Sequence, residues 1–242
     1  MERKTITIET SYDGHYVIPD GVTEIGYYAF FGCNLSSVEI PNSVTSIGHS
    51  AFYHCRNLTS LEIPNSVTSI DACAFDGCSS LSSIVFPASL ASIGNMAFKG
   101  CSKLRSITVD EDNPCFSDWD GVLYNKDMSC LLHYPAGKEE VSYLVPYGMT
   151  HFDLGIFDDA VYLKAVYLPE TIESLMILSD KFGEGSLREL HIMVDDPETM
   201  DVEVTPHFFD AVKNITLYVP IGSSEAYREH WSPAEFKDII EE

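Results

Sequence analysis

The sequence predicts a solenoid, a fold in which short coils of chain stack on one another around a continuous core. Two observations predict it. A phrase such as IPNSVTSIGHSAFYHC recurs four times in the first half of the chain, beginning at Ile18, Ile40, Ile63 and Phe86. A phenylalanine and a cysteine keep their places in every copy, at Phe30, Phe52, Phe75 and Phe98 and at Cys33, Cys55, Cys78 and Cys101, with steps of 22, 23 and 23 residues. Because so short a repeat cannot bury an apolar face alone, neighbouring copies must stack.

The first part of each repeat predicts a short strand. Leu58, Leu61 and Ile63 follow the L-x-x-L-x-L spacing that is typical of leucine-rich repeats. Alternation at Leu61 and Ile63 points both side chains inward, while Ser60 and Glu62 point outward. A proline follows and ends the strand, because it has no N–H for the ladder.

The same pattern predicts nine strands on one face, which we expect to form the parallel sheet on the concave side. They are Tyr16–Ile18, Val38–Ile40, Leu61–Ile63, Ile84–Phe86, Ile107–Val109, Tyr143–Val145, Val166–Leu168, Leu190–Ile192 and Ile215–Leu217. At about 4.8 Å between strands, such a sheet would extend roughly 40 Å.

The second part of each repeat returns the chain across the core. In the third copy, Val67 and Ile70 line this return and Ala74-Phe75 fills the convex side. The pattern before Cys78 is too brief for a long helix, so it predicts a single helical or 3₁₀ turn on the convex side.

The repeat carries Ile-Pro after the strand and Ala-Phe-x-x-Cys at the far corner, and it resembles the BspA-type leucine-rich repeats of bacterial and protist surface proteins. Later copies are weaker: Val145-Pro146 and Leu168-Pro169 keep the spacing, but Ala160 replaces the cysteine. The resemblance implies a cell-surface or secreted, adhesin-like module that binds a host or bacterial surface protein.

We expect one solenoid over residues 1–242, with regular repeats at 1–109, a hairpin insertion at 110–144, degenerate repeats at 145–220 and a cap at 221–242. In the insertion, the turn residues 125–127 separate Val122–Tyr124 from Cys130–Tyr134, which predicts a β-hairpin. Its Asn-Pro and Gly-Val-Leu-Tyr phrases resemble an insertion common in the family. The cap is predicted to contain a Ser-capped helix near Ser224–Glu229, with Trp231, Phe236 and Ile239 covering the last coil.

The charge of the chain excludes some partners. The net charge of the chain is −23. Residues 1–105 carry six Lys and Arg against nine Asp and Glu, a balance of −3. The remaining residues carry eight Lys and Arg against 28 Asp and Glu, a balance of −20. Such an acidic field repels phosphate backbones, so no nucleic-acid partner is expected.

No stretch approaches the ~20 apolar residues of a membrane span. The N-terminal sequence has no apolar signal-peptide region, so either the protein stays inside the cell or a leader was removed.

The residues with chemical potential favour structural roles. Of the seven cysteines, the four repeated ones are expected to form a row of buried free thiols, because parallel side chains on successive coils make disulfides awkward. Acidic clusters at Asp110–Asp112, Asp118–Asp120 and Asp195–Glu198 are expected to be solvated turns rather than Ca²⁺ loops. We expect no catalytic residue, metal or cofactor. A hydrolase that uses the acidic half remains an alternative.

The outward side of the sheet is the candidate binding surface, since concave solenoid faces commonly bind proteins. Its candidate residues are Ser37, Ser60, Ser83 and Ser106 in one row, Glu39, Glu62, Val85 and Thr108 in the next, and Tyr167 and His191 at the far end. The alternatives are an ordinary solvated face, or a convex aromatic cluster of Tyr27, Tyr28, Phe31 and Tyr53. We therefore predict a non-enzymatic protein-binding module, with an intracellular repeat scaffold as the alternative.

Overall fold

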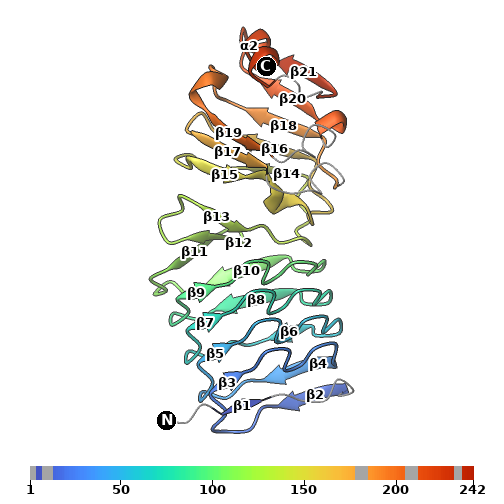
Figure 1. Ribbon diagram of the computed structural model, residues 1–242, viewed down its shortest axis with the longest axis vertical. Coiled ribbons are helices and arrows are strands. Elements are labelled where there is room, and N and C mark those ends of the chain that lie inside the picture. The colour runs from blue at the N-terminus through green and yellow to red at the C-terminus, as the bar shows by residue number, and fades with distance from the viewer. Residues whose placement is uncertain (1–3, 7–12, 178–184, 205–211, 232–235) are drawn as a thin grey trace. The chain divides into compact units, whose positions relative to one another are not determined.

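A computed structural model of the protein describes residues 4–6, 13–177, 185–204, 212–231 and 236–242 (Figure 1). Contacts divide the chain into two compact units. The first unit comprises residues 1–127 and 135–138, and the second comprises residues 128–134 and 139–242. Each unit is a parallel β-solenoid, as the repeats predict.

The predicted strand face of the first unit is present. It contains β2 (Asp13–Val17), β4 (Asn34–Glu39), β6 (Ser60–Leu61), β8 (Ser83–Phe86) and β10 (Ser106–Val109). Strands β2, β4 and β6 pair in parallel, as do β8 and β10. A bridge between Glu62 and Val85 joins the two groups. Each coil therefore adds one strand to this face, in the register that the repeat sets.

The first unit also has a second parallel sheet, which the sequence analysis did not predict. It contains β1 (Thr5–Ile6), β3 (Glu24–Ile25), β5 (Ser46–Ile47), β7 (Ser69–Ile70) and β9 (Ser92–Ile93), paired in that order. The segment interpreted as a plain return thus forms two-residue strands. The alternating sequence at Thr5–Thr10 also predicts a short strand, of which only Thr5 and Ile6 lie within the described residues.

The far corners of these coils are hydrogen-bonded turns. Positive φ angles at Tyr28, Ser50, Cys73 and Met96 prevent a helical run there. Backbone amides in these corners instead donate hydrogen bonds to carbonyl oxygens of the next coil. For example, the Phe75 N–H donates to the Ala97 carbonyl oxygen at 2.8 Å. A 3₁₀ turn of the predicted kind occurs in the second unit, at η1 (Leu154–Phe157).

The repeated phenylalanines form a buried stack, as predicted. Ring centroids lie 4.9 Å apart for Phe30 and Phe52, 5.2 Å for Phe52 and Phe75, and 5.5 Å for Phe75 and Phe98, with nearly parallel planes. On the strand face, the inward residues Val38, Leu61, Ile63, Ile84 and Phe86 are also buried, whereas Ile40 is half-buried. The phase of the repeat was therefore predicted correctly on both sides of the coil.

The repeated cysteines are buried free thiols, which confirms that prediction. Cys55, Cys78 and Cys101 donate their S–H groups to the carbonyl oxygens of Phe30, Phe52 and Phe75, at 2.9, 3.2 and 3.2 Å. Burial, with a smaller contribution from the charge of Cys33, raises the pKa of Cys55 to about 12. These thiols join successive coils without disulfides.

The insertion contains both predicted hairpin strands and one strand that was not predicted. Strand β12 (Val122–Asn125) pairs antiparallel with β11 (Phe116–Trp119), around the turn at Asp120-Gly121. The second predicted hairpin strand is present as β13 (Leu131–His133). Lys138 holds the turn, because its buried ammonium lies 2.9 Å from an Asp120 carboxylate oxygen and 2.8 Å from the Asp120 carbonyl oxygen. The sequence analysis predicted β12 and β13 but not β11, which pairs with β12.

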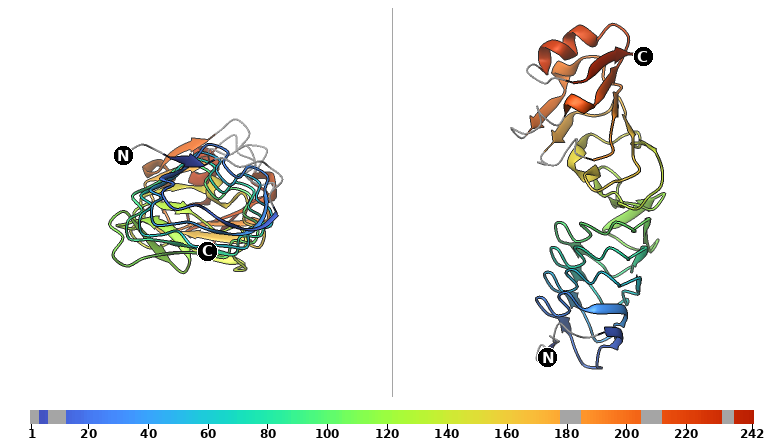
Figure 2. Two further views of the ribbon diagram at one scale, coloured as in Figure 1. Left: turned by 90° about the horizontal axis from the view of Figure 1, so that it is seen from below. Right: turned by 90° about the vertical axis from the view of Figure 1, so that its right-hand side faces the viewer.

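The second unit repeats the two-sheet plan with degenerate coils (Figure 2). Its strand face contains β14 (Ser142–Leu144), β16 (Ala165–Leu168), β18 (Glu189–Ile192), β20 (Thr216–Val219) and β21 (Asp238–Glu241). Its other sheet contains β15 (His151–Asp153), β17 (Ser174–Ile177) and β19 (Asp201–Val204). Two further 3₁₀ turns are η2 (Pro197–Thr199) and η3 (Val212–Asn214).

The cap contains the predicted helix, α2 (Ser224–His230), and the additional strand β21 beside β20. Trp231 is buried as expected, and Ile239 is half-buried. Ser223 occupies the N-cap position without a side-chain capping bond, because its hydroxyl donates to the Pro220 carbonyl oxygen at 2.7 Å. Glu241 accepts from the Ser224 amide instead, and hydrogen bonds from Ser224 lower the pKa of Glu241.

Candidate interaction surface

The first unit presents a polar strand face. Ser37 pairs with Ser60 and Ser83 pairs with Ser106, so the predicted serine row is in register. Ser60 and Ser83 are exposed, whereas Ser37 and Ser106 are half-buried. The neighbouring row of Glu39, Glu62, Val85 and Thr108 is exposed, and Val85 is its one large apolar member. This face matches the prediction in geometry, but it carries little apolar surface.

The second unit presents a different strand face. Its strand register brings five outward residues together in the order Leu144, Tyr167, His191, Tyr218 and Ile240. We call these five residues the aromatic row. Leu144 is 73% exposed and Ile240 is 38% exposed. At the equivalent position of each strand, the first unit has Glu39, Glu62, Val85 and Thr108, so the second unit carries more apolar and aromatic surface there.

His191 is buried within this row, although the sequence analysis expected it on an open surface. Its ring stacks between Tyr167 and Tyr218, with centroids 4.0 and 4.2 Å away. Its Nδ1 lies 2.6 Å from a Glu242 carboxylate oxygen, and its Nε2 lies 3.7 Å from a Glu189 oxygen. Desolvation first, and then the charges of Glu189 and Glu242, raise the pKa of Tyr218. The tyrosines, not the histidine, thus present the surface of the stack.

Sequence reasoning missed three members of the aromatic row. Tyr218 could have been found, since Leu-Tyr-Val at 217–219 alternates like Val-Tyr-Leu at 166–168. Leu144 follows the same rule, one residue before Val145-Pro146. Ile240 carries no such signal, because the cap sequence around it was interpreted as part of a helical cap rather than as a strand.

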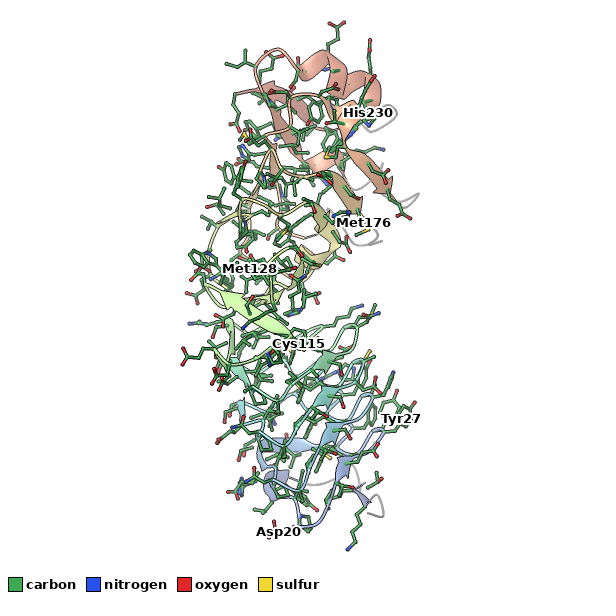
Figure 3. All side chains as sticks on the ribbon, turned by 90° about the vertical axis from the view of Figure 1, so that its left-hand side faces the viewer. Asp20, Tyr27, Cys115, Met128, Met176 and His230 are labelled. Atoms are coloured by element: carbon green, nitrogen blue, oxygen red, sulfur yellow. The ribbon has the colours of Figure 1, made fainter. Side chains whose placement is uncertain are left out.

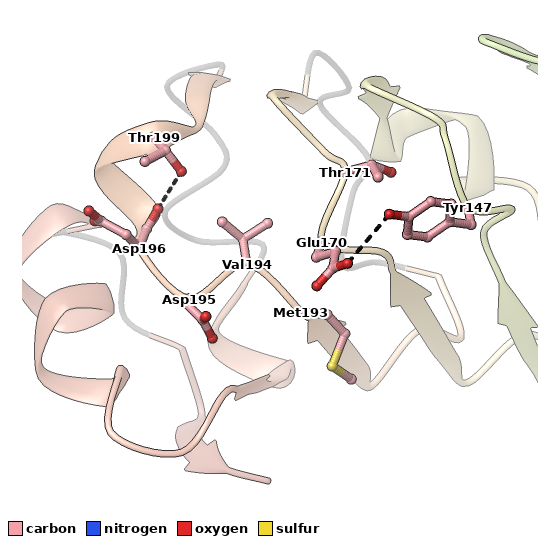
Figure 4. A pocket seen from close by; sticks show the side chains of 8 residues that line it. All are labelled: Tyr147, Glu170, Thr171, Met193, Val194, Asp195, Asp196 and Thr199. Carbon is pink, nitrogen blue, oxygen red and sulfur yellow. Dashed lines mark hydrogen bonds between the residues drawn. The ribbon is translucent and has the colours of Figure 1, made fainter.

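An acidic depression lies just beyond the C-terminal ends of these strands, with a volume of about 490 Å³. Figure 4 shows its lining residues, which are Tyr147, Glu170, Thr171, Met193, Val194, Asp195, Asp196 and Thr199. We call it the acidic pocket. The Tyr147 hydroxyl donates to a Glu170 carboxylate oxygen at 3.5 Å. Asp196 accepts from the Glu198 amide at 3.0 Å, so its carboxylate also caps η2.

The first unit has two further surface features, a groove and an aromatic cluster. A shallow groove of about 330 Å³ follows the second sheet, with Ser46, Ser69 and Ser92 along its floor. The convex cluster contains exposed Tyr27 and Phe31, and Tyr27 lies at the surface (Figure 3). Tyr28 and Tyr53 are half-buried and pack against Phe31, with centroids 5.2 and 5.7 Å away. This cluster is therefore largely satisfied by its own contacts.

Carboxylates of the acidic clusters accept hydrogen bonds from nearby backbone amides. Asp118 accepts from the Val109 amide at 2.7 Å, and Asp110 accepts from the Asp112 amide at 3.0 Å. Within the described residues, no group of three or more His, Cys, Asp and Glu side chains is placed to hold a metal ion. Across the same ranges, every helix is too short or too polar to cross a membrane.

Residues 14–119 match the model of the BspA type leucine rich repeat region, in six copies. No curated protein matches the sequence. The match lies in the half of the chain where the repeated phrase is strongest.

Solved bacterial structures share the fold. The pneumococcal vaccine antigen PcpA is 20% identical over 99% of this chain and 79% of its own, with a TM-score of 0.61. A leucine-rich repeat protein from Eubacterium ventriosum is 18% identical over 85% of this chain and 72% of its own, with a TM-score of 0.54. A leucine-rich repeat protein from Bacteroides ovatus is 20% identical over 99% of this chain and 69% of its own, with a TM-score of 0.52.

Proposed function

Residues 14–119 belong to the BspA-type leucine-rich repeats, and on that premise we propose that this protein is a non-enzymatic module that binds another protein through its strand face. Solenoids of stacked repeats commonly bind proteins on extended surfaces of this kind. The proposal includes the serine and glutamate rows of the first unit and the aromatic row of the second.

The observation that carries the proposal is the aromatic row. Leu144 and Ile240 expose apolar surface on a sheet whose inward side already holds the core of the second unit. Exposed apolar residues that line up across neighbouring strands favour a contact surface more than isolated ones do. Tyrosine is also enriched where proteins meet, because it combines a large apolar ring with a polar hydroxyl.

We further propose that the protein acts at the cell surface or after secretion. The resemblance to BspA-type surface proteins supports this location, and PcpA, which shares the fold, is described as a vaccine antigen. An intracellular scaffold is the alternative. Detection of the native protein in the surface or culture fraction of its cell, beside a cytosolic marker, separates the two.

A binding assay on immobilised extracellular-matrix and bacterial-surface proteins tests the proposed function. Two variants block the strand face: Ser60→Arg with Ser83→Arg in the first unit, and Leu144→Arg in the second. Each introduces a bulky charge at an exposed position. Thr45→Arg with Thr68→Arg makes the same change at exposed positions beside the other sheet of the first unit, so it is the matched control.

We expect at least one strand-face variant to lose capture of a partner that the wild type and the control both bind. Capture that is equal in all four proteins would move the contact away from the strand face. A catalytic turnover that disappears when one carboxylate is replaced would contradict the non-enzymatic assignment and favour the hydrolase alternative.

A further inference from the structure

We propose that the aromatic row and the acidic pocket form one docking surface for a basic protein segment, in which a lysine or arginine lies beside apolar side chains. This inference rests on the proposed function and narrows its partner class. The basic side chain enters the acidic pocket, and the apolar side chains lie on the row near Leu144 and Tyr167.

The two features adjoin within the second unit. Tyr147 follows Leu144 by three residues, Glu170 follows Tyr167 by three, and Met193 follows His191 by two. Each coil thus passes directly from the row into the wall of the pocket as it leaves its strand. An occupant that covers both needs to span only the end of one sheet.

The surface is apolar enough to bind a side chain out of water. Tyr147 is 76% exposed and Met193 is 38% exposed, so both present uncovered apolar atoms in the wall of the acidic pocket. The Tyr167–His191–Tyr218 stack is already rigid, because its rings cover one another and Glu242 holds the imidazole. A preformed platform loses little side-chain entropy when a partner binds.

Charge complementarity identifies the occupant as basic. The pocket carries Glu170, Asp195 and Asp196, and its eight lining residues include no lysine or arginine. Glu189 and Glu242 add acidic groups beside the row. The exposed ring of Tyr147 adds a cation–π contact for an ammonium or guanidinium group. A phosphate or a nucleic acid would be repelled at this surface.

The overall charge argues against a second copy of the chain as the occupant. The second unit has six Lys and Arg against 22 Asp and Glu, a balance of −16. Two such surfaces would repel each other, whereas a basic partner would be attracted over several ångströms before contact.

The test uses the full-length chain and a phage library of random twelve-residue peptides, followed by calorimetric titration of the selected peptide. We expect the selected peptides to contain lysine or arginine next to leucine, valine or an aromatic residue. Glu170→Gln combined with Asp195→Asn should weaken binding by about tenfold or more, since two charged contacts are lost. Leu144→Ser should weaken it in the same direction.

Glu111→Gln combined with Asp112→Asn is the matched control, because it removes two exposed charges from the first unit at positions outside its strand face. It should leave the dissociation constant unchanged. Binding by the wild type should also weaken as the salt concentration rises, since exposed ion pairs are screened.

The outcomes separate the two proposals. Selected peptides without basic residues that still lose binding on Leu144→Ser would overturn the partner class and retain the proposed function. Peptide binding that no strand-face variant affects would overturn both. A concentration-dependent dimer, seen by sedimentation and removed by Leu144→Ser, would replace the basic segment with a second copy of the chain.

Discussion

At the scale of single residues, the phenylalanine stack ties each coil of the first unit to the next. Phe75 lies between Phe52 and Phe98 and is completely buried. The backbone on either side is held by bonds between coils, such as Phe75 N–H to the Ala97 carbonyl oxygen. A cavity at this position therefore cannot close by collapse of the neighbours.

Phe75→Ala should lower the free energy of unfolding by about 3–5 kcal/mol, because it removes apolar burial and leaves such a cavity. Urea unfolding measures the loss. Val85→Ala, at a position that is 56% exposed on the same unit, is the control and should change stability by less than about 0.5 kcal/mol. Equal losses for the two variants would show that the stack contributes nothing specific.

The buried thiols predict both a reactivity and a pH dependence. The pKa of Cys55 rises from 9.0 to about 12 in the folded state, and that of Cys78 is also raised, chiefly by burial. The unfolded chain therefore loses thiol protons at a lower pH than the folded chain does. The contribution of Cys55 to stability is complete below pH 9 and decreases as the pH rises from 9 toward 12.

A thiol reagent at pH 8 should leave Cys33, Cys55, Cys78 and Cys101 unmodified in the folded protein. All seven cysteines should react after denaturation. Mass spectrometry of the labelled peptides identifies each site. Fast labelling of Cys55 or Cys78 in the native protein would contradict the burial of the row.

At the scale of elements, the turn of the β11–β12 hairpin depends on a glycine. Gly121 has a φ of +76°, and a Cβ there would lie 2.8 Å from the Cβ of Ser106. Gly121→Ala should therefore destabilise the first unit through both backbone strain and a steric clash.

Gly21→Ala separates these two effects. Gly21 has a φ of +85°, but a Cβ there would meet no atom within 4 Å. It should cost only the strain, of roughly 1–2 kcal/mol, and Gly121→Ala should cost more when the thermal midpoints are compared. If the two variants unfold alike, the contact with Ser106 does not constrain the turn.

The C-terminal cap is attached by a buried hydroxyl. Tyr227 of α2 is fully buried, and its hydroxyl donates to the Val194 carbonyl oxygen at 2.8 Å. Tyr227→Phe removes the donor and leaves that buried carbonyl unsatisfied, so it should cost about 1–3 kcal/mol in urea unfolding. Tyr162→Phe, at an exposed position, is the control and should be nearly neutral. A neutral Tyr227→Phe would mean that water replaces the lost bond.

Most elements of the strand face were predictable, because the same apolar positions recur in every copy of the repeat and indicate which residues are buried. All nine predicted strands overlap observed ones, and the residues at Leu61 and Ile84 point inward as expected. The second sheet was missed because a two-residue strand such as Ser46–Ile47 gives no periodic signal of its own. Strand β21 was missed because its pairing with β20 joins segments whose sequences carry no shared phrase.

The candidate surface was predictable in position but not in character. Alternation placed Tyr167 and His191 on the outward side correctly. It could not show that two rings would cover His191, because that depends on the register of three strands that lie far apart in the sequence. The acidic pocket was also invisible, since its walls come from residues between the strands, where no pattern repeats.

At the scale of the whole molecule, the acidic charge is concentrated in one unit. The first unit carries eight Lys and Arg against 15 Asp and Glu, a balance of −7, whereas the second has a balance of −16. Repulsion among like charges destabilises a compact state, and dissolved salt screens it. The two units should therefore respond differently to ionic strength.

The two tryptophans allow each unit to be followed separately. Trp119 lies in β11 of the first unit, and Trp231 lies beside α2 of the second. Trp119→Phe therefore leaves Trp231 to report on the second unit, and Trp231→Phe leaves Trp119 to report on the first. In thermal melts followed by fluorescence, added NaCl should raise the midpoint of the second unit by a few degrees. About 1 kcal/mol of relieved repulsion corresponds to roughly 4 °C for a domain of this size. The first unit should change less and serves as the internal control. Equal shifts in both units would indicate a general effect of salt on protein hydration. The acidic charge would then not destabilise the second unit, which favours a role for that charge in binding.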